Sequence, residues 1–316
     1  MQTRALGTSG LEIVPLVLGG NVFGWTIDEA QSFKVLDAFV DRGFNCIDTA
    51  DVYSYWVPGH TGGESETIIG RWFAHSGKRE KVILATKVGM KMPNVGEGLR
   101  KDYILREVEQ SLKRLQTDFI DLYQSHKDDE STPLEETLEA YAELLKSGKV
   151  RAIGASNYKG ERLTQAMETA KQRNLPAYTT LQPDYNLYDR QDYESDLAPV
   201  AAKYGLGVIP YFSLASGFLT GKYQSLEDTK GKNRGSRVEK YFNDRGMKIL
   251  AALKQVSGET GAQQASIALA WLLAQPTITA PIASATSPQQ LEALFAAVDL
   301  KLSDAQLKAL TEASAF

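Results

Sequence analysis

The chain has little of several features that define whole classes of protein. Its 316 residues contain one cysteine, Cys46, so no disulfide can form within the chain and a disulfide framework is excluded. Positive charge is not in excess, because 35 basic residues face 39 acidic ones and the formal net charge is −4. A surface that wraps nucleic acid is therefore not expected.

Long apolar runs are also missing. The strongest, residues 267–274, is far shorter than the roughly 20 residues needed to span a bilayer. The first ten residues, MQTRALGTSG, lack the apolar stretch of a secretory signal. These absences predict a cytoplasmic protein with no membrane partner.

Histidine is scarce as well. The three histidines, His60, His75 and His126, show no ligand spacing such as His-x-His. We therefore expect no metal site, and a metal-dependent lyase is disfavoured. What the chain does have, 43% hydrophobic and 23% charged residues, is typical of a globular protein with a large core.

Short β-branched and apolar runs recur along the chain. They lie at residues 16–18, 45–47, 82–84, 119–122, 150–153, 178–181, 207–209 and 277–279 with Ile282. Between them lie amphipathic stretches with apolar residues three and four apart, as in 30–40 and 103–115, which indicate helices. Because the strand runs are continuously apolar rather than alternating, they are typical of a parallel sheet covered by helices.

The residues between these elements agree with an alternating strand–helix order. Gly43, Gly77, Gly148 and Gly205 each follow a helical stretch and precede a strand, where a left-handed residue ends the helix. Thr132-Pro133 predicts an N-cap followed by a first-turn proline.

Eight repeats without a low-complexity linker predict one domain over residues 1–316, an α/β fold of the single (β/α)8 TIM-barrel type. A doubly wound Rossmann-like sheet is the lesser alternative. It lacks support because residues 18–24, after the first predicted strand, do not have the GxGxxG spacing.

Three segments lie outside the repeat. Residues 3–14 contain a Thr-Ser-Gly turn and predict an N-terminal β-hairpin across the barrel floor. Residues 214–245 are rich in glycine, lysine and arginine without clear periodicity, and long loops within compact domains are usually functional. Residues 303–313 predict an extra C-terminal helix.

Polar residues at the carboxyl ends of barrel strands are the candidates for chemistry. Asp48 and Tyr53 follow the second predicted strand, Lys87 the third and His126 the fourth. A phenol has a pKa near 10 and donates a proton well at neutral pH only if its anion is stabilised. A buried lysine can stabilise it, a carboxylate can hold the lysine, and an imidazole can bind a carbonyl oxygen. Together the four side chains indicate proton donation to a carbonyl.

These residues resemble the aldo-keto reductase superfamily in order and in local context. The chain has Asp-Thr-Ala before the tyrosine, Thr-Lys at one strand end and Tyr-Gln-x-His at the next. Family-like stretches at 154–158, 181–186, 214–223 and 285–291 extend the resemblance over nearly the whole chain, as in bacterial members related to the branch of potassium-channel β subunits. The resemblance implies that Tyr53 is the general acid, that Lys87 lowers its pKa, that Asp48 pairs with Lys87 and that His126 orients the substrate carbonyl.

The same resemblance implies a nicotinamide cofactor. Ser156, Asn157 and Gln182 would hold the carboxamide, Tyr211 would stack on the nicotinamide ring, and residues 214–222 would fold over the pyrophosphate. The implied cofactor residues are Gly20, Asn21, Ser156, Asn157, Gln182, Tyr211, Leu214, Ala215, Gly217, Lys222, Arg234, Arg237, Thr286 and Gln290.

The chain departs from the family pattern in places. Ser213 stands where many members have proline, and Ala293 and Leu294 stand where Glu and Asn often contact adenine. A Lys and Arg clamp is absent at Ser284 and Gln290. Positive charge for a 2′-phosphate must therefore come from Lys222, Arg234 or Arg237. NADP(H) is favoured, and NAD(H) is the alternative.

The expected substrate is a small-molecule carbonyl or alcohol. Trp25 and Trp56 would wall an apolar pocket above Tyr53, and such a pocket accepts aldehydes, ketones or a sugar carbon. The leading hypothesis is an NADP(H)-dependent carbonyl reductase. Alternatives are an alcohol or sugar dehydrogenase working in the oxidative direction and a cofactor-binding regulatory subunit with little turnover. His126 argues against the regulatory role, because the channel-subunit relatives usually have another residue there.

Overall fold

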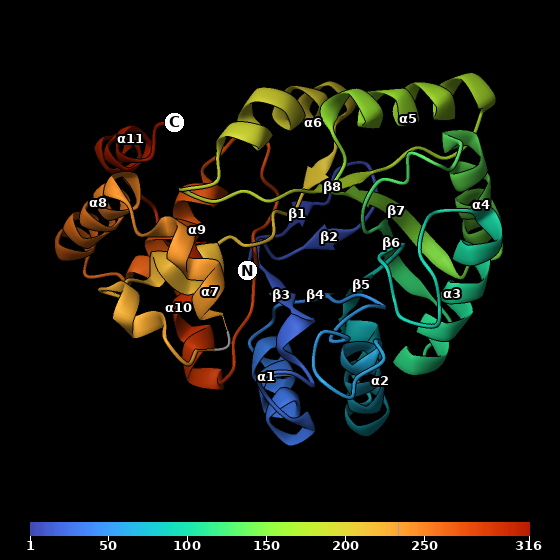
Figure 1. Ribbon diagram of the computed structural model, residues 1–316, viewed down its shortest axis with the longest axis horizontal. Helices are drawn as coiled ribbons and strands as arrows, with labels where there is room; N and C mark the ends of the chain where they lie inside the picture. Colours follow the sequence, from blue (N-terminus) through green and yellow to red (C-terminus); the bar gives the residue numbers. More distant parts are fainter. Residues whose placement is uncertain (233) are drawn as a thin grey trace.

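Eight parallel strands form the centre of the computed structural model, which describes residues 1–232 and 234–316 (Figure 1). In sheet order they run β10, β3, β4, β5, β6, β7, β8, β9. Their bounds are β3 Val17–Gly19, β4 Cys46–Asp48, β5 Ile83–Val88, β6 Ile120–Ser125, β7 Val150–Ser156, β8 Thr180–Gln182, β9 Gly207–Val208 and β10 Ile282–Ala283. The Ile282 amide donates to the Pro210 carbonyl at 2.9 Å. This bond joins β10 to the residues just after β9 and so closes the sheet into a barrel. The (β/α)8 TIM barrel is confirmed.

The last strand lies further along the chain than the sequence predicts. The sequence predicts it at residues 277–279 with Ile282. Ile282 is confirmed as part of the strand Ile282–Ala283, but residues 277–279 make a turn with one bridge between Val208 and Ile278. Pro276 and Pro281 flank the turn, and neither has a backbone N–H to donate to a ladder.

Helices follow the strands and surround the barrel (Figure 1). They are α1 Glu29–Asp41, α2 Glu64–Ser76, α3 Lys101–Leu115, α4 Leu134–Lys146, α5 Gly160–Arg173, α6 Ala198–Tyr204, α7 Gly235–Val238, α8 Asp244–Thr260, α9 Gln264–Leu273, α10 Pro288–Asp299 and α11 Asp304–Ala313. In the described part of the chain, no helix is long and apolar enough to cross a membrane.

The helix ends largely follow the predicted pattern. Gly43, Gly77, Gly148 and Gly205 all have positive φ, between 64° and 97°. The start of α4 differs, because Pro133 itself occupies the cap position and no side chain caps the helix. The hydroxyl of Thr132 instead donates to Asp129 Oδ2 at 2.6 Å.

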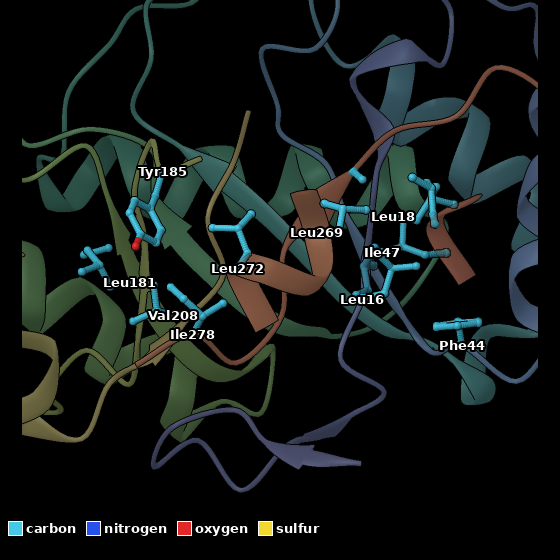
Figure 2. Close-up of a cluster of buried hydrophobic side chains, with 14 of the residues drawn as sticks. Leu16, Leu18, Phe44, Ile47, Leu181, Tyr185, Val208, Leu269, Leu272 and Ile278 are labelled. Atoms are coloured by element: carbon cyan, nitrogen blue, oxygen red, sulfur yellow. The ribbon is translucent and has the colours of Figure 1, made fainter. Parts of the chain in front are cut away.

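Outward-facing strand side chains pack against the helices and make the main core. Figure 2 shows Leu16, Leu18 and Ile47 on one side of it and Leu181, Val208 and Tyr185 on the other, with Leu269 and Leu272 of α9 between. A second buried cluster, including Val17, Cys46, Ala85 and Leu122, fills the barrel interior. The barrel is thus a packed core with its open end beyond this inner layer.

The N-terminal hairpin closes the opposite end of the barrel, as predicted. β1 (Arg4–Ala5) pairs antiparallel with β2 (Glu12–Ile13). Leu6 and Ile13 belong to the inner cluster. At Gly7 a Cβ would lie 2.3 Å from the Gly207 amide, so only glycine allows the hairpin to approach β9 this closely.

The C-terminal end carries the predicted extra helix. Ser303 caps α11 and forms a capping box with Gln306. α11 packs against α8 outside the ring of helices (Figure 1).

The described residues of the segment 214–245 are more ordered than the sequence predicts. It contains short 3-10 helices at Ala215–Thr220, Leu226–Thr229 and Glu239–Tyr241, besides α7. Each is too short to show the periodicity by which a longer helix is recognised.

Candidate active site

The alternation of side chains along the barrel strands determines which polar residues point into the barrel. Residues two apart on a strand point to the same face. Asp48 therefore follows the inward-facing Cys46, and Lys87 follows the inward-facing Ala85. Gln124 relates in the same way to Leu122 on β6. The three polar side chains form the next inner layer at the carboxyl end of the barrel.

Lys87 is the centre of this layer. Its side chain is fully buried, and its ammonium lies 2.6 Å from Asp48 Oδ2, 2.8 Å from the Thr49 carbonyl and 3.2 Å from the Tyr53 hydroxyl. Burial alone would lower the pKa of Lys87, but Asp48 and Tyr53 more than offset it and the pKa is raised. Lys87 is therefore a cation at neutral pH.

The second oxygen of Asp48 is held by two amides. Gln182 donates to Asp48 Oδ1 at 2.9 Å and Gln124 donates to it at 3.2 Å. The amide of Gln182 also donates to Gln124 Oε1 at 3.2 Å. Sequence reasoning missed Gln124, although its position two residues after Leu122 and two before His126 could have revealed it.

Tyr53 lies on the loop after β4 with its ring among aromatic side chains. Its centroid is 5.8 Å from that of His126 and 5.6 Å from that of Trp56, both nearly edge-to-face. Burial raises the pKa of Tyr53, while the Lys87 ammonium lowers it, and burial has the larger effect. The resemblance implied the lowering by Lys87; in the free protein the net direction is upward, so the hydroxyl keeps its proton.

His126 is neutral in this environment. Burial lowers the pKa of its imidazole well below the usual 6.5, and the charges of Lys87 and Lys127 lower it further. Its Nδ1 is buried without a hydrogen-bond partner in the described part of the chain. A neutral imidazole can donate one hydrogen bond to a carbonyl oxygen. It does so without placing a second positive charge beside Lys87.

A cavity of about 1070 Å³ opens above these residues. Fourteen of the predicted site residues line it: Asn21, Asp48, Tyr53, His126, Ser156, Asn157, Gln182, Tyr211, Leu214, Gly217, Lys222, Arg234, Thr286 and Gln290. Lining residues that the sequence did not single out include Met90, Phe212 and Gln263.

Six predicted site residues lie beside the cavity rather than on its lining: Gly20, Trp25, Trp56, Lys87, Ala215 and Arg237. Lys87 lies beneath Tyr53, and Arg237 lies over the Phe212 ring at 5.8 Å. Trp56 packs edge-on against both Tyr53 and Trp25, so the tryptophans support the wall from behind.

The residues predicted to hold a carboxamide are hydrogen-bonded to one another. The Tyr211 hydroxyl donates to Asn157 Oδ1 at 2.7 Å, and Asn157 Nδ2 donates to the His126 carbonyl at 2.8 Å. The Ser156 hydroxyl donates to the Gln182 carbonyl at 2.8 Å. These bonds tie the ends of β6, β7 and β8 together on one side of the cavity.

The charged side chains that line the cavity are mostly basic. Among the described lining residues Asp48 is the only carboxylate, and it is paired with Lys87. The cations Lys127, Lys222, Lys232 and Arg234 line the same space. A lining of this charge suits an anionic ligand.

The backbone after β9 can come close to such a ligand. Gly217 has φ of +101° and Ser216 has φ of +56°, and a Cβ at Gly217 would lie 3.2 Å from the Lys222 ammonium. Because Gly217 has no side chain, the backbone N–H groups here can approach a phosphate closely, next to the Lys222 ammonium. By contrast, residues 1–232 and 234–316 hold no cluster of three or more His, Cys, Asp or Glu side chains fit for a metal ion.

Asp184, just beyond β8, gives the fold a testable pH dependence. Burial raises the pKa of Asp184 to about 7; the charges of Asp189 and Asp192 add to this rise, and Lys240 opposes it. The folded state thus holds a proton that the unfolded chain releases near its ordinary pKa of 3.8, so stability falls as pH rises from about 4 to about 7.

We expect Asp184→Asn to remove this loss. The free energy of unfolding in urea should rise by about 1–3 kcal/mol at about pH 8, with a smaller gain at about pH 5. An equal change at both pH values would contradict a proton held by Asp184.

Known proteins resemble this chain over almost its whole length. The sequence pattern of the Aldo/keto reductase family matches residues 15–315. The oxidoreductase YrpG of Bacillus subtilis (strain 168) is 38% identical in an alignment 320 positions long, which covers 99% of this chain and 95% of the relative. The aldo-keto reductase YhdN of the same organism is 36% identical, covering 93% of this chain and 88% of the relative.

A third relative is named for a different role. The probable voltage-gated potassium channel subunit beta of Oryza sativa subsp. japonica is 32% identical, covering 95% of this chain and 92% of the relative. The barrel fold, the buried polar layer and these similarities lead to the same conclusion, that the chain belongs to the aldo/keto reductase family.

Proposed function

We propose that the protein is an NADP(H)-dependent reductase of aldehydes or ketones. The observation that carries the proposal is the position of the Lys87 ammonium, 2.6 Å from Asp48 and 3.2 Å from the Tyr53 hydroxyl, beneath a cation-lined cavity. This arrangement stabilises a phenolate at the moment a proton leaves it.

Each side chain then has a defined task. Tyr53 donates its proton to the carbonyl oxygen, and Lys87 stabilises the phenolate that remains. Asp48 keeps Lys87 charged and in place, and neutral His126 binds the carbonyl oxygen. When bound, a reduced nicotinamide supplies the hydride that the carbonyl carbon accepts. Tyr53 regains its proton from solvent after the alcohol leaves.

The volume of the cavity and its basic lining support a nicotinamide dinucleotide as the cofactor. We assign the ring end to Tyr211, Ser156 and Asn157, and the phosphates to the Gly217 turn with Lys222. Thr286 and Gln290 at the start of α10 would bind the adenosine end. As the single cysteine, Cys46, is buried in the barrel interior, the enzyme suits a reducing, cytoplasmic compartment.

Lys222→Gln tests the phosphate assignment. We expect the Kd of NADPH to rise about tenfold and that of NADH to change less, because the Lys222 ammonium would make a charge-assisted bond to the 2′-phosphate, which NADH lacks. The readout is quenching of protein fluorescence in equilibrium titrations. Lys230→Gln is the matched control, since Lys230 is exposed and paired with Glu227. An equal effect on both coenzymes would reject Lys222 as the 2′-phosphate contact.

The proposed activity is tested by the loss of reduced-nicotinamide absorbance with a reactive aromatic aldehyde such as 4-nitrobenzaldehyde. We expect turnover with NADPH and slower turnover with NADH. Tight binding of either coenzyme without turnover of any aldehyde would reject the reductase.

Two other functions are compatible with the same site. Oxidation of an alcohol or sugar would use the tyrosinate as base, and the kcat/KM values of aldehyde with NADPH and of alcohol with NADP+ separate the directions. A cofactor-binding regulatory role follows from the similarity to the rice channel-subunit protein. Negligible turnover together with capture of a membrane partner would support that role.

A further inference from the structure

One carboxylate holds both ends of the loop that carries Tyr53. Glu64, the first residue of α2, accepts a hydrogen bond from the Ser54 amide at 3.1 Å through Oε2. At the far end of the loop, its Oε1 accepts from the Thr61 amide at 2.8 Å, and the Gly62 amide donates to both oxygens at 3.2 and 3.1 Å. Hydrogen bonds to a charged acceptor are stronger than those between neutral groups. The loop is thereby closed at Glu64.

The peptide group after Tyr53 binds the first turn of α2 through both of its polar atoms. Its N–H, that of Ser54, donates to Glu64, and its carbonyl oxygen, that of Tyr53, accepts from the Ser65 amide at 3.2 Å. The Ser65 hydroxyl in turn donates to the Gly20 carbonyl, directly after β3, at 2.8 Å. The backbone of Tyr53 is therefore fastened to a helix that is itself fastened to the barrel.

The carboxylate and the loop share a second support in the segment after β3. A Cβ at Gly24 would lie 3.2 Å from the Glu64 Cβ, so the chain passes directly against the glutamate. The Ser54 hydroxyl donates to the Phe23 carbonyl at 3.3 Å. These contacts restrict where Glu64 can place its two oxygens.

The proposed reaction depends on this anchoring because Tyr53 lies on a loop, whereas Lys87 lies on β5. The Tyr53 hydroxyl must stay near the ammonium of Lys87, which is 3.2 Å away, and within hydrogen-bond reach of the substrate oxygen. A displacement of about 1 Å in a reacting group can cost about 10²-fold in rate. Glu64 lies outside the cavity lining, so it can affect the reaction only through the loop.

We propose that Glu64 is a positioning residue for proton transfer. By binding the backbone at both ends of the loop, its carboxylate keeps the Tyr53 hydroxyl beside Lys87 and facing the substrate carbonyl. The inference rests on the proposed reductase function and adds a residue to the machinery of that site.

Glu64→Gln tests the proposal. Glutamine has the same length, but it offers one acceptor oxygen and turns an NH2 group toward backbone N–H donors. We expect kcat for 4-nitrobenzaldehyde with NADPH to fall about 10- to 100-fold. The Kd of NADPH, measured by fluorescence titration, should stay near that of the native protein. Glu64→Asp keeps two acceptor oxygens on a shorter side chain, so it should lose less activity than Glu64→Gln.

Glu161→Gln is the matched control. Glu161 is exposed and lies in the first turn of α5, so this variant removes the same charge from the start of another barrel helix. Its kcat should equal that of the native protein.

A double variant distinguishes positioning from a general defect of the fold. If Glu64 acts by placing the Tyr53 hydroxyl, its effect requires that hydroxyl. Adding Glu64→Gln to Tyr53→Phe should then leave the residual rate of Tyr53→Phe unchanged, as measured by mass spectrometry of the alcohol formed over long incubations.

Three results would overturn the inference. Native kcat in Glu64→Gln, with the native protein active, rejects the positioning role and leaves the reductase standing. A loss that is equally large with and without the Tyr53 hydroxyl shows that Glu64 supports the fold rather than the proton transfer. Failure of the native protein to reduce the aldehyde rejects the reductase and the inference with it.

Discussion

Tyr53→Phe is expected to lower kcat for aldehyde reduction by about 10²- to 10⁴-fold, the usual contribution of a general acid. Phenylalanine keeps the ring contacts with Trp56 and His126 and removes only the hydroxyl that lies 3.2 Å from Lys87. The Kd of NADPH and the melting temperature should stay unchanged. Steady-state kinetics and fluorescence titration measure the two effects separately.

Tyr55→Phe is the matched control for this experiment. Tyr55 is two residues away and 39% exposed, so loss of its hydroxyl should leave kcat near that of the native protein. Turnover that survives in Tyr53→Phe would show that another group donates the proton. An equal loss in both variants would point to damage of the loop rather than to chemistry.

Lys87→Met should reduce both activity and stability. It removes the cation that stabilises the Tyr53 phenolate, so we expect kcat to fall at least about 10²-fold. It also leaves Asp48, which is 2% exposed, buried without its ion-pair partner, at a cost of about 3 kcal/mol in the free energy of unfolding. Urea unfolding and steady-state kinetics are the two measurements.

A double variant separates the two losses. Adding Asp48→Asn to Lys87→Met removes the unpaired charge while keeping a side chain of the same shape for Gln124 and Gln182 to contact. Stability should return and activity should not. Recovery of activity in the double variant would show that Lys87 acts on the fold alone.

The sequence predicts the barrel because apolar periodicity is a local property. A continuous apolar strand and an amphipathic helix such as 101–115 are each visible within a few residues. Residues 277–279 were wrongly included in the last strand, because the position of this strand at Ile282 depends on the Pro210 carbonyl just beyond β9. That partner is 72 residues away and leaves no local pattern.

The candidate site was predictable where residues stand at strand ends. Asp48, Tyr53, Lys87 and His126 do, and the structure brings them together. Gln124 was missed because a glutamine within a strand has no distinctive chemistry until its partner Asp48 is known.

The segment after β9 was the least predictable part. Its cations all appear in the sequence as one basic loop, yet Lys222 lies by Gly217, Arg234 over Trp25 and Arg237 over Phe212. These different places follow from short helices and long-range packing, which composition cannot distinguish.

In the proposed reaction, hydride reaches the carbonyl carbon while Tyr53 protonates the oxygen. The most direct test uses NADPH carrying deuterium at both positions of nicotinamide C4, with mass spectrometry of the alcohol formed from 4-nitrobenzaldehyde. We expect one deuterium on the carbinol carbon with the native protein and almost no alcohol with Tyr53→Phe. Alcohol without deuterium, or the same yield from both proteins, would contradict it.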